Sequence, residues 1–166
     1  VVTVCADRFS KAWIDSTLAL GEQRVVIEGW LYLTHARNDG AAFGLLSDSE
    51  PQLKLVVFAA AAGLAVIVVL LHLIGLAPGE RRVATALGLV AGGAIGNLAD
   101  RLPQIGGGEV IDFLHVDLWG GYDWPDFNLA DVAIVLGVAG LLVDMIAREA
   151  ALRADHDPLE VDDTRA

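Results

Sequence analysis

Two aspartates, Asp112 and Asp131, stand in apolar surroundings without a basic neighbour in the sequence. Asp112 lies in EVIDFL and Asp131 lies in FNLADVAIV. Ionised groups are costly at membrane depth, so each such acid needs a partner or a function. If the fold brings the two acids together, repulsion and desolvation hold one proton between them, so that one carboxylate is a base while the other carboxyl donates. A water molecule between them would then be a hydrolytic nucleophile.

A second set of polar residues has simpler interpretations. Asp7 and Lys11 are four residues apart, in the order that favours an ion pair on one helix face. Asp100 and Arg101 mark a helix end, where we expect their charges to reach interfacial water. Asn97 precedes Arg101 by four residues, so these two side chains can face one cavity. From the residues alone, capping and anchoring explain this set as well as a binding role does.

Other hydrolytic mechanisms fit the sequence less well. The sequence has no HExxH motif, and its four histidines are scattered, which argues against a zinc site. Ser10 and Lys11 are adjacent, so on a helix they point away from each other and do not form a Ser–Lys pair. The lone Cys5 is interpreted as a small apolar side chain. We therefore expect no metal and no organic cofactor.

The apolar composition predicts a membrane protein. Hydrophobic residues make up 55% of the 166 residues, above the roughly 45–50% usual for soluble domains. About 20 apolar residues cross a bilayer, and we predict spans over about 55–76, 83–101 and 129–147. The segment 1–20 is interpreted as the end of a first span whose beginning is absent. Together with 151–166 as an acidic, disordered cytoplasmic tail, this gives a single membrane domain over 1–150.

The distribution of basic residues predicts the orientation of the spans. The turn APGERR holds two arginines, and Arg148 and Arg153 follow the last span, whereas 100–127 holds Arg101 alone. Because basic loops stay in the cytoplasm, we expect this turn and the C-terminus to be cytoplasmic. Residues 20–54 and 102–127 are then external. The net charge of −11 makes nucleic acid an unfavourable partner.

The remaining patterns predict how the spans are joined and packed. Beta-branched and aromatic residues with the turn sequence Asn38-Asp39-Gly40 predict a small strand-rich element within 20–54. The loop 102–127 is interpreted as an aromatic belt in the headgroup zone, formed by Trp119, Tyr122, Trp124 and Phe127. Glycines at steps of four predict close helix packing at Gly88, Gly92 and Gly96, with Gly93 beside them. The fold class is thus an all-α integral membrane protein, a four-transmembrane-helix bundle with a truncated first span and a small β-rich extracytoplasmic element.

Five blocks of sequence, in this order, resemble those of one known family. They are DRFSK, ARNDGAAFG, GAIGNLADR, EVIDF and FNLAD. Together they resemble the lipoprotein signal peptidases, the bacterial membrane aspartyl peptidases also called signal peptidase II. The likeness covers nearly the whole chain. It departs from the expected pattern at the start of the first span and at GGGE, which lengthens the approach to Asp112.

The resemblance implies a specific reaction and a specific site. It implies a four-span protein with an outer β-like cradle, which cleaves diacylglyceryl-modified prolipoproteins just before the lipidated cysteine. Asp112 and Asp131 would be the catalytic dyad, with their acid and base roles left open. A supporting or substrate-contacting role is implied for Asp7, Lys11, Asn38, Gly40, Asn97, Asp100, Arg101 and Asn128.

The same resemblance implies a cellular location and partners. We expect a multi-pass protein of the bacterial cytoplasmic (inner) membrane, monomeric, with its active site near the extracytoplasmic face. Its partners would be the prolipoprotein substrate and membrane lipids. Two other classes remain open on the residues alone. One is a small transporter or proton-relay subunit that uses intramembrane carboxylates; the other is a noncatalytic membrane scaffold.

Overall fold

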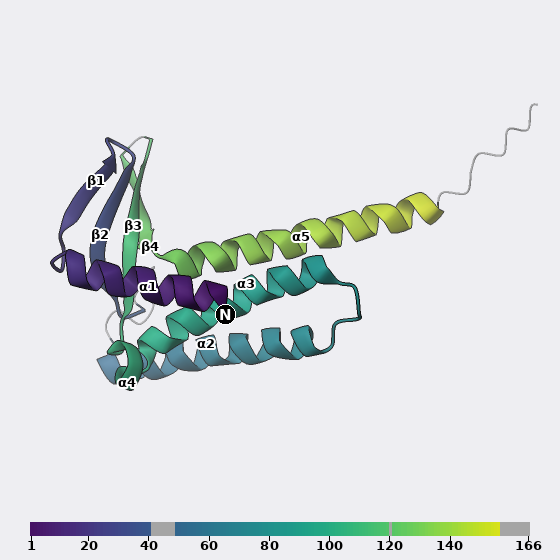
Figure 1. Ribbon diagram of the computed structural model, residues 1–166, viewed down its shortest axis with the longest axis horizontal. Coiled ribbons are helices and arrows are strands. Elements are labelled where there is room, and N and C mark those ends of the chain that lie inside the picture. The colour runs from purple at the N-terminus through teal and green to yellow at the C-terminus, as the bar shows by residue number, and fades with distance from the viewer. Residues whose placement is uncertain (41–48, 120, 157–166) are drawn as a thin grey trace, which may run out of the picture.

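In the computed structural model, residues 1–40, 49–119 and 121–156 are described, and they form a helical body with a small sheet at one end (Figure 1). The sheet is antiparallel, with strand order β1-β2-β3-β4. The elements in chain order are α1 (Val2–Thr17), β1 (Gln23–Ile27), β2 (Leu31–Asn38), α2 (Pro51–Ile74), α3 (Arg81–Arg101), α4 (Pro103–Gly106), β3 (Val110–Leu118), β4 (Tyr122–Phe127) and α5 (Leu129–His156).

Three of the described helices are long and apolar enough to cross a membrane. They are α2, α3 and the Leu129–Ala154 part of α5. Many of their large apolar side chains are exposed in the isolated chain, as expected for surfaces that contact lipid. The protein is therefore a multi-pass membrane protein with a small antiparallel sheet. The α1 helix has 16 residues, fewer than the about 20 that a full crossing takes.

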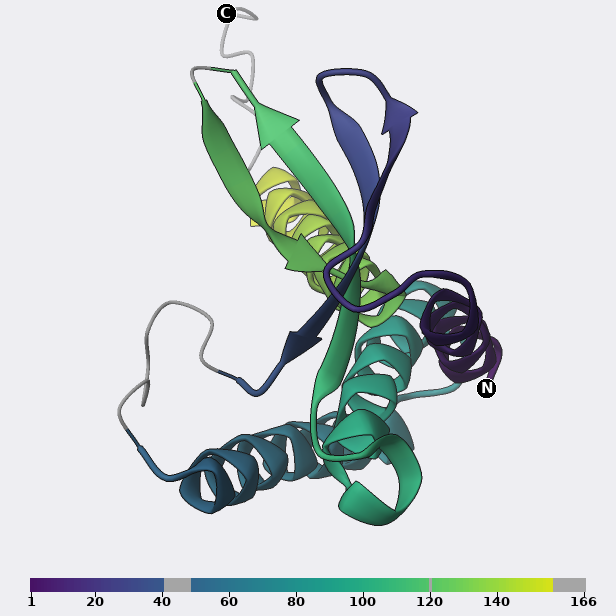
Figure 2. The same cartoon turned by 90° about the vertical axis from the view of Figure 1, so that its left-hand side faces the viewer.

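The α3 helix is the centre of the helical body and packs against α1, α2 and α5 (Figure 2). Its small residues allow this close packing. A side chain at Gly92 would collide with Thr3 of α1, and one at Gly93 would collide with the backbone of Ala130 in α5. Gly96 likewise leaves room for the Asp7 carboxylate. The prediction was wrong for Gly88, because a side chain there would meet no neighbour within 4 Å.

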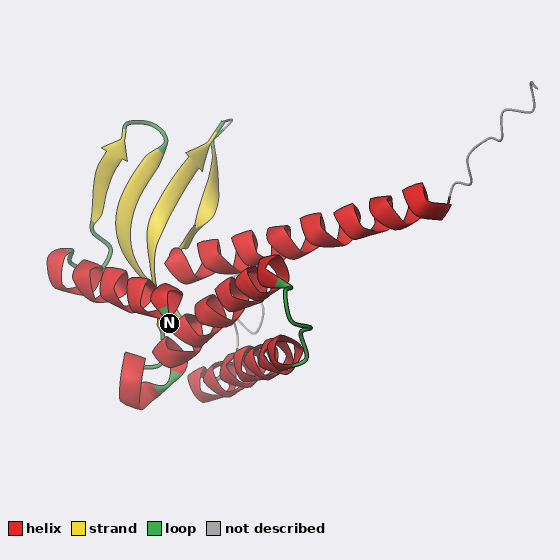
Figure 3. Ribbon diagram, turned by 45° about the vertical axis from the view of Figure 1, so that its right-hand side comes forward, coloured by secondary structure: helices red, strands yellow, loops and turns green. Residues whose placement is uncertain are grey.

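Strand β3 of the sheet packs against α1 and against the C-terminal end of α3, where the predicted site residues of that helix lie (Figure 3). Ile14 and Leu18 of α1 form a buried cluster with Ile111 and Phe113 of β3. This cluster fixes the beginning of β3 against the helices. In β2 and β3 the register pairs Ala36 with Asp112. The strand-rich element predicted within 20–54 is confirmed by β1 and β2.

Two sequence predictions need correction. Residues 110–118 and 122–127 are not loop: they form the paired strands β3 and β4, so Asp112 lies on a strand. The predicted all-α fold class is therefore correct for the helical body only, because the chain also forms a four-stranded sheet. The α5 helix continues to His156, so residues 151–156 are helical where a tail was expected, and residues 157–166 lie outside the described part of the chain.

Candidate active site

Asp112 is held by two amide side chains from different elements. Its Oδ2 accepts a hydrogen bond from Asn38 Nδ2 at 2.9 Å, and its Oδ1 accepts one from Asn128 Nδ2 at 2.7 Å. The residue is 3% exposed. Asn38 is at the end of β2, beside β3, and Asn128 immediately precedes α5. The three chain segments thus meet at one carboxyl group.

Asp131 lies in the first turn of α5, where an anion is favoured by the helix dipole. Its Oδ1 accepts a hydrogen bond from Asn97 Nδ2 at 2.8 Å. Its Oδ2 accepts one from the backbone N–H of Asn128 at 3.1 Å, while the Asp131 N–H donates to Asn128 Oδ1 at 3.1 Å. This reciprocal pair is a capping box, and it fixes both side chains at the helix start.

Asn128 therefore contacts both acids, and the two carboxyl groups are close enough to interact electrostatically. Burial raises the pKa of Asp112 to about 6, the hydrogen bonds from Asn38 and Asn128 oppose this, and the charge of Asp131 adds to it. The structure brings together the two acids that the sequence singled out. Asp112 comes from the strand β3 and Asp131 from the helix α5.

Lys11 is the centre of a buried ionic cluster next to the acids. Its Nζ lies 2.8 Å from Asp7 Oδ2, 2.7 Å from Asp100 Oδ2 and 2.9 Å from Asn97 Oδ1. Arg8 pairs with the other carboxylate oxygen of Asp100. Lys11 is 1% exposed and Asp7 is 0% exposed. The Asp7–Lys11 pair predicted from the spacing is confirmed.

Asp100 does not reach interfacial water, contrary to the expectation from the sequence, because it is 1% exposed. The short α4 turn lies against its backbone, so that a side chain at Gly106 would collide with Asp100. Asp7 also ties α1 to α5, since its Oδ1 accepts the backbone N–H of Ala130 at 3.1 Å. The cluster therefore fixes α1, α3 and the start of α5 relative to one another.

Arg101 and Asn97 face the same side of α3, as their spacing predicted. Arg101 Nη1 donates to the backbone carbonyl of Asn97 at 3.2 Å. The guanidinium lies over the Phe58 ring, 5.9 Å from its centroid, and attracts both Asp112 and Asp131. Phe58 was not singled out from the sequence, because it stands in an apolar run without any polar signal.

Gly40 holds Asn38 in place. Its backbone N–H donates to Asn38 Oδ1 at 2.8 Å, which leaves the Asn38 amide nitrogen to face Asp112. Its φ of +99° is one that residues with a side chain rarely adopt, and a side chain there would collide with the Phe58 ring. The rest of the block that begins ARNDG, residues 41–44, lies outside the described residues.

One group with metal-binding side chains lies on the β3–β4 hairpin. One ligand atom each of His115, Asp117 and Asp123 lies within 4.8 Å of the others. Both ring nitrogens of His115 already have partners, Asp126 at 2.7 Å and Asp117 at 2.9 Å. Burial opposes protonation of His115, but the hydrogen bonds to Asp126 and Asp117 raise its pKa. The geometry is that of a histidinium between two carboxylates.

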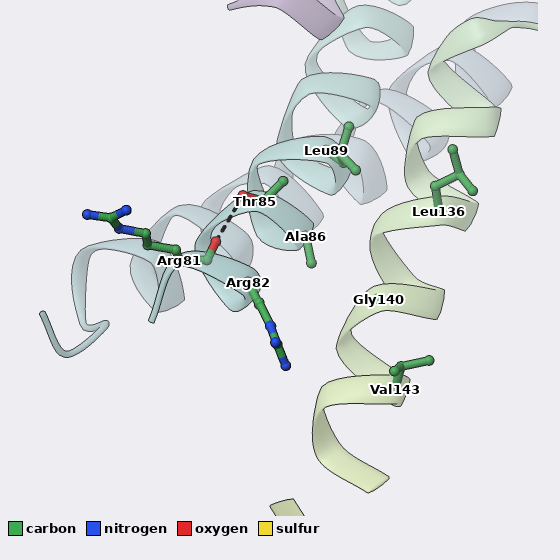
Figure 4. Close-up of a pocket in the computed structure, with 8 residues that line it drawn as sticks. All are labelled: Arg81, Arg82, Thr85, Ala86, Leu89, Leu136, Gly140 and Val143. Atoms are coloured by element: carbon green, nitrogen blue, oxygen red, sulfur yellow. Dashed lines mark hydrogen bonds between the residues drawn. The ribbon is translucent and has the colours of Figure 1, made fainter. Parts of the chain in front are cut away.

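Two apolar hollows lie along α5. One, of about 280 Å³, begins at Asp131 and is lined further by Trp124, Phe127, Val132, Val135 and Leu136. The other, of about 600 Å³, lies between α3 and α5 at the opposite end of α3, beside Arg81 and Arg82 (Figure 4). The first hollow gives a lipid-facing path to Asp131, whereas the second is lined by none of the site residues predicted above.

These features define a membrane protein whose polar site holds two neighbouring carboxyl groups in an apolar body. The model of the family described as signal peptidase (SPase) II matches residues 1–147, and the chain belongs to this family. It is accordingly a membrane aspartic peptidase.

Relatives and solved structures agree with this assignment. The chain is 43% identical over 143 residues to a protein of Geobacter sulfurreducens named lipoprotein signal peptidase, covering 86% of each chain. It is 40% identical over 158 residues to the Pseudomonas fluorescens protein of that name, covering 95% of this chain and 90% of the other. A bacterial membrane enzyme solved by the in meso method at 1.9 Å resolution superposes with a TM-score of 0.74 at 32% identity, covering 87% of each chain.

Proposed function

We propose that the protein removes the signal peptide from diacylglyceryl-modified prolipoproteins and cleaves just before the lipidated cysteine. The family membership and the names of the relatives support this reaction. The observation that carries it for this chain is the shared hydrogen bonding of Asn128 to Asp112 and Asp131. Two acids held by one residue have the closeness to each other that a shared proton requires.

The reaction follows from the two carboxyl groups. One carboxylate takes a proton from a water molecule between them, and the water oxygen attacks the scissile carbonyl carbon. The second, protonated carboxyl donates a hydrogen bond to the carbonyl oxygen as negative charge develops there. Arg101 adds positive charge beside the pair. The hydrogen bonds from Asn38, Asn97 and Asn128 hold both acids in place.

The apolar setting suits a substrate that carries its own lipid. Asp131 lines a hollow whose other walls are apolar side chains of β4 and α5. A diacylglyceryl group keeps the scissile bond at the membrane boundary, because burial of each CH₂ in lipid is worth about 0.8 kcal/mol. The acids therefore have to lie at the same boundary.

We further propose a multi-pass orientation in the bacterial inner membrane with the sheet outside. Arg81 and Arg82 begin α3, and Arg148 and Arg153 lie near the end of α5, at the opposite end of the body from the sheet (Figure 1). Basic residues favour the cytoplasmic side. In this orientation α1 belongs to a fourth span, the C-terminus is cytoplasmic, and a monomer contains the complete site.

The positions of the acids argue against a proton relay. They gather near the sheet, whereas a relay would need acids across the whole depth of the membrane; these acids are Asp7, Asp100, Asp112 and Asp131.

The test uses the purified full chain in lipid nanodiscs with a diacylated prolipoprotein peptide. The matched substrate has serine in place of the lipidated cysteine. We expect one cleavage, located by mass spectrometry immediately before the lipidated cysteine, at a rate at least about 100-fold above that of the serine substrate. Equal cleavage of both substrates, or a cut at another bond, would contradict the proposed function.

A further inference from the structure

The side-chain amide of Asn97 lies between a cation and an acid. Its Oδ1 accepts a hydrogen bond from Lys11 Nζ at 2.9 Å, and its Nδ2 donates to Asp131 Oδ1 at 2.8 Å. The two ends of an amide are similar in shape, so the partners decide which end faces which way. A lysine ammonium group has donors and no acceptor, so it fixes the Asn97 oxygen toward itself. The Asn97 nitrogen is thereby directed at Asp131.

We propose that Lys11 is a positioning residue that locks the Asn97 amide, so that the amide N–H holds Asp131 as the ionised member of the pair. Asp131 is then the base and Asp112 the proton donor. This inference rests on the proposed function and deepens it, since it assigns the two roles that the sequence left open.

Lys11 acts through Asn97 because it is itself immobilised. Its ammonium group donates hydrogen bonds to Asp7 and Asn97 and forms an ion pair with Asp100 Oδ2 at 2.7 Å, and its side chain is 1% exposed. Asp7 and Asp100 face the charge of Lys11, and Arg8 pairs with Asp100. The charge of Lys11 also acts on Asp112, where it opposes the rise in pKa.

The surroundings of the two acids differ in the sense that the proposal requires. Each acid accepts two hydrogen bonds, Asp131 from Asn97 and the backbone N–H of Asn128, Asp112 from the side chains of Asn38 and Asn128. Arg101 attracts both acids. Only Asp131 lies at a helix start, where the helix dipole favours an anion. Asp112 lies close enough to Asp131 for their like charges to repel each other. Asp112 is the more deeply buried acid, at 3% exposed, and burial raises its pKa to about 6. The shared proton therefore favours Asp112.

The resulting step is balanced. Asp131 takes one proton from water as the water oxygen bonds to the carbonyl carbon, and Asp112 gives its proton to the carbonyl oxygen. When the C–N bond breaks, the proton on Asp131 passes to the leaving amine nitrogen. One hydroxyl proton of the tetrahedral intermediate returns to Asp112, so both groups regain their starting states.

The experiment measures kcat/KM against pH for the full chain and for two methionine variants. The acidic limb reports protonation of the base. In Lys11→Met the Asn97 amide is free to turn its oxygen toward Asp131, so we expect this limb to move up by about one pH unit. Arg8→Met is the matched control, because it also removes a positive charge paired with Asp100 but leaves the Lys11–Asn97 hydrogen bond. Its acidic limb should stay with that of the parent chain.

Asn97→Asp is the second variant and keeps both ion pairs of Lys11. It places an oxygen where the donating nitrogen stands, so its acidic limb should also move up. The inference is overturned if the acidic limb of kcat/KM lies at the same pH in Lys11→Met and in the parent chain. It is also overturned if Arg8→Met shifts this limb as far as Lys11→Met does. If Lys11→Met does not fold, an unshifted limb in Asn97→Asp overturns it. Absence of cleavage by the parent chain at every pH would instead contradict the proposed function.

Discussion

Asn128 and Asp131 exchange two hydrogen bonds of 3.1 Å at the start of α5, and this exchange turns the amide nitrogen of Asn128 toward Asp112. A helix cap thereby becomes part of the geometry of the site. The first helical turn orients Asp131, and the capping residue orients its partner acid. The hydrogen bonds that begin α5 therefore also set the positions of the two acids.

Replacement of Asn128 by aspartate separates these two effects. Aspartate caps a helix as well as asparagine does, but it has no N–H to donate to Asp112. We expect the thermal midpoint in detergent to change little and the cleavage rate to fall about 2- to 10-fold, the value of a hydrogen bond to a neutral group. A variant that cleaves at the parent rate would show that the Asn128–Asp112 contact is dispensable.

Gly93 and Gly88 provide a matched test of helix packing within α3. A methyl group at position 93 would collide with the backbone of Ala130, whereas position 88 is open. Gly93→Ala should lose about 1–3 kcal/mol of stability, and it should displace the start of α5, lowering activity as well. Gly88→Ala should gain up to about 1 kcal/mol from helix propensity. Thermal unfolding in detergent measures both, and equal effects at the two positions would contradict the packing described.

Burial of Asp112 should make stability depend on pH. Because burial raises its pKa to about 6 from 3.8, the folded chain binds a proton that the unfolded chain has already lost between these values. This contribution is complete below about pH 4 and is lost as pH rises through about 6. The stability of the parent chain relative to Asp112→Asn should therefore fall over this window by about 3 kcal/mol. A difference that is independent of pH would show that folding does not raise the pKa of Asp112.

Orientation can be measured with single cysteines introduced on a Cys5→Ser background. A cysteine at exposed Trp119 of the hairpin should react with an impermeant maleimide added to whole cells. One at Gly79, in the turn between α2 and α3, should react after the membrane is opened. The reverse pattern would place the sheet in the cytoplasm.

Periodicity and hydropathy were sufficient to predict most of the helical body. The uncharged runs predicted α2, α3 and α5 because lipid-facing helices need few polar residues, and the four-residue spacing predicted the Asp7–Lys11 pair. The β3–β4 hairpin was missed because EVIDFLHV and YDWPDF lack clear alternation, and pairing with β2 supplies the strand geometry that local sequence does not. The burial of Asp100 depends on α4 folding back over it, a tertiary contact that no spacing indicates.

The resemblance singled out residues that the structure brings together, whereas their local patterns did not. Asn38, Asn97 and Asn128 carry no distinctive signal, since an isolated asparagine is as common in a turn or a cap as beside a carboxylate. Three distant segments turn them toward the same two acids. Phe58, which lies under the Arg101 guanidinium, and Arg8, which pairs with Asp100, were not among the predicted site residues.

The most direct test of the central claim compares cleavage of one diacylated prolipoprotein by the parent chain, Asp112→Asn and Asp131→Asn, each shown to be folded by its thermal midpoint. Both substitutions nearly preserve shape and remove one ionisable group. If the two carboxyl groups share the activation of one water molecule, each variant alone should lose at least about 1,000-fold in rate, and the double variant should lose little more. Cleavage by either folded single variant at the parent rate would contradict the account.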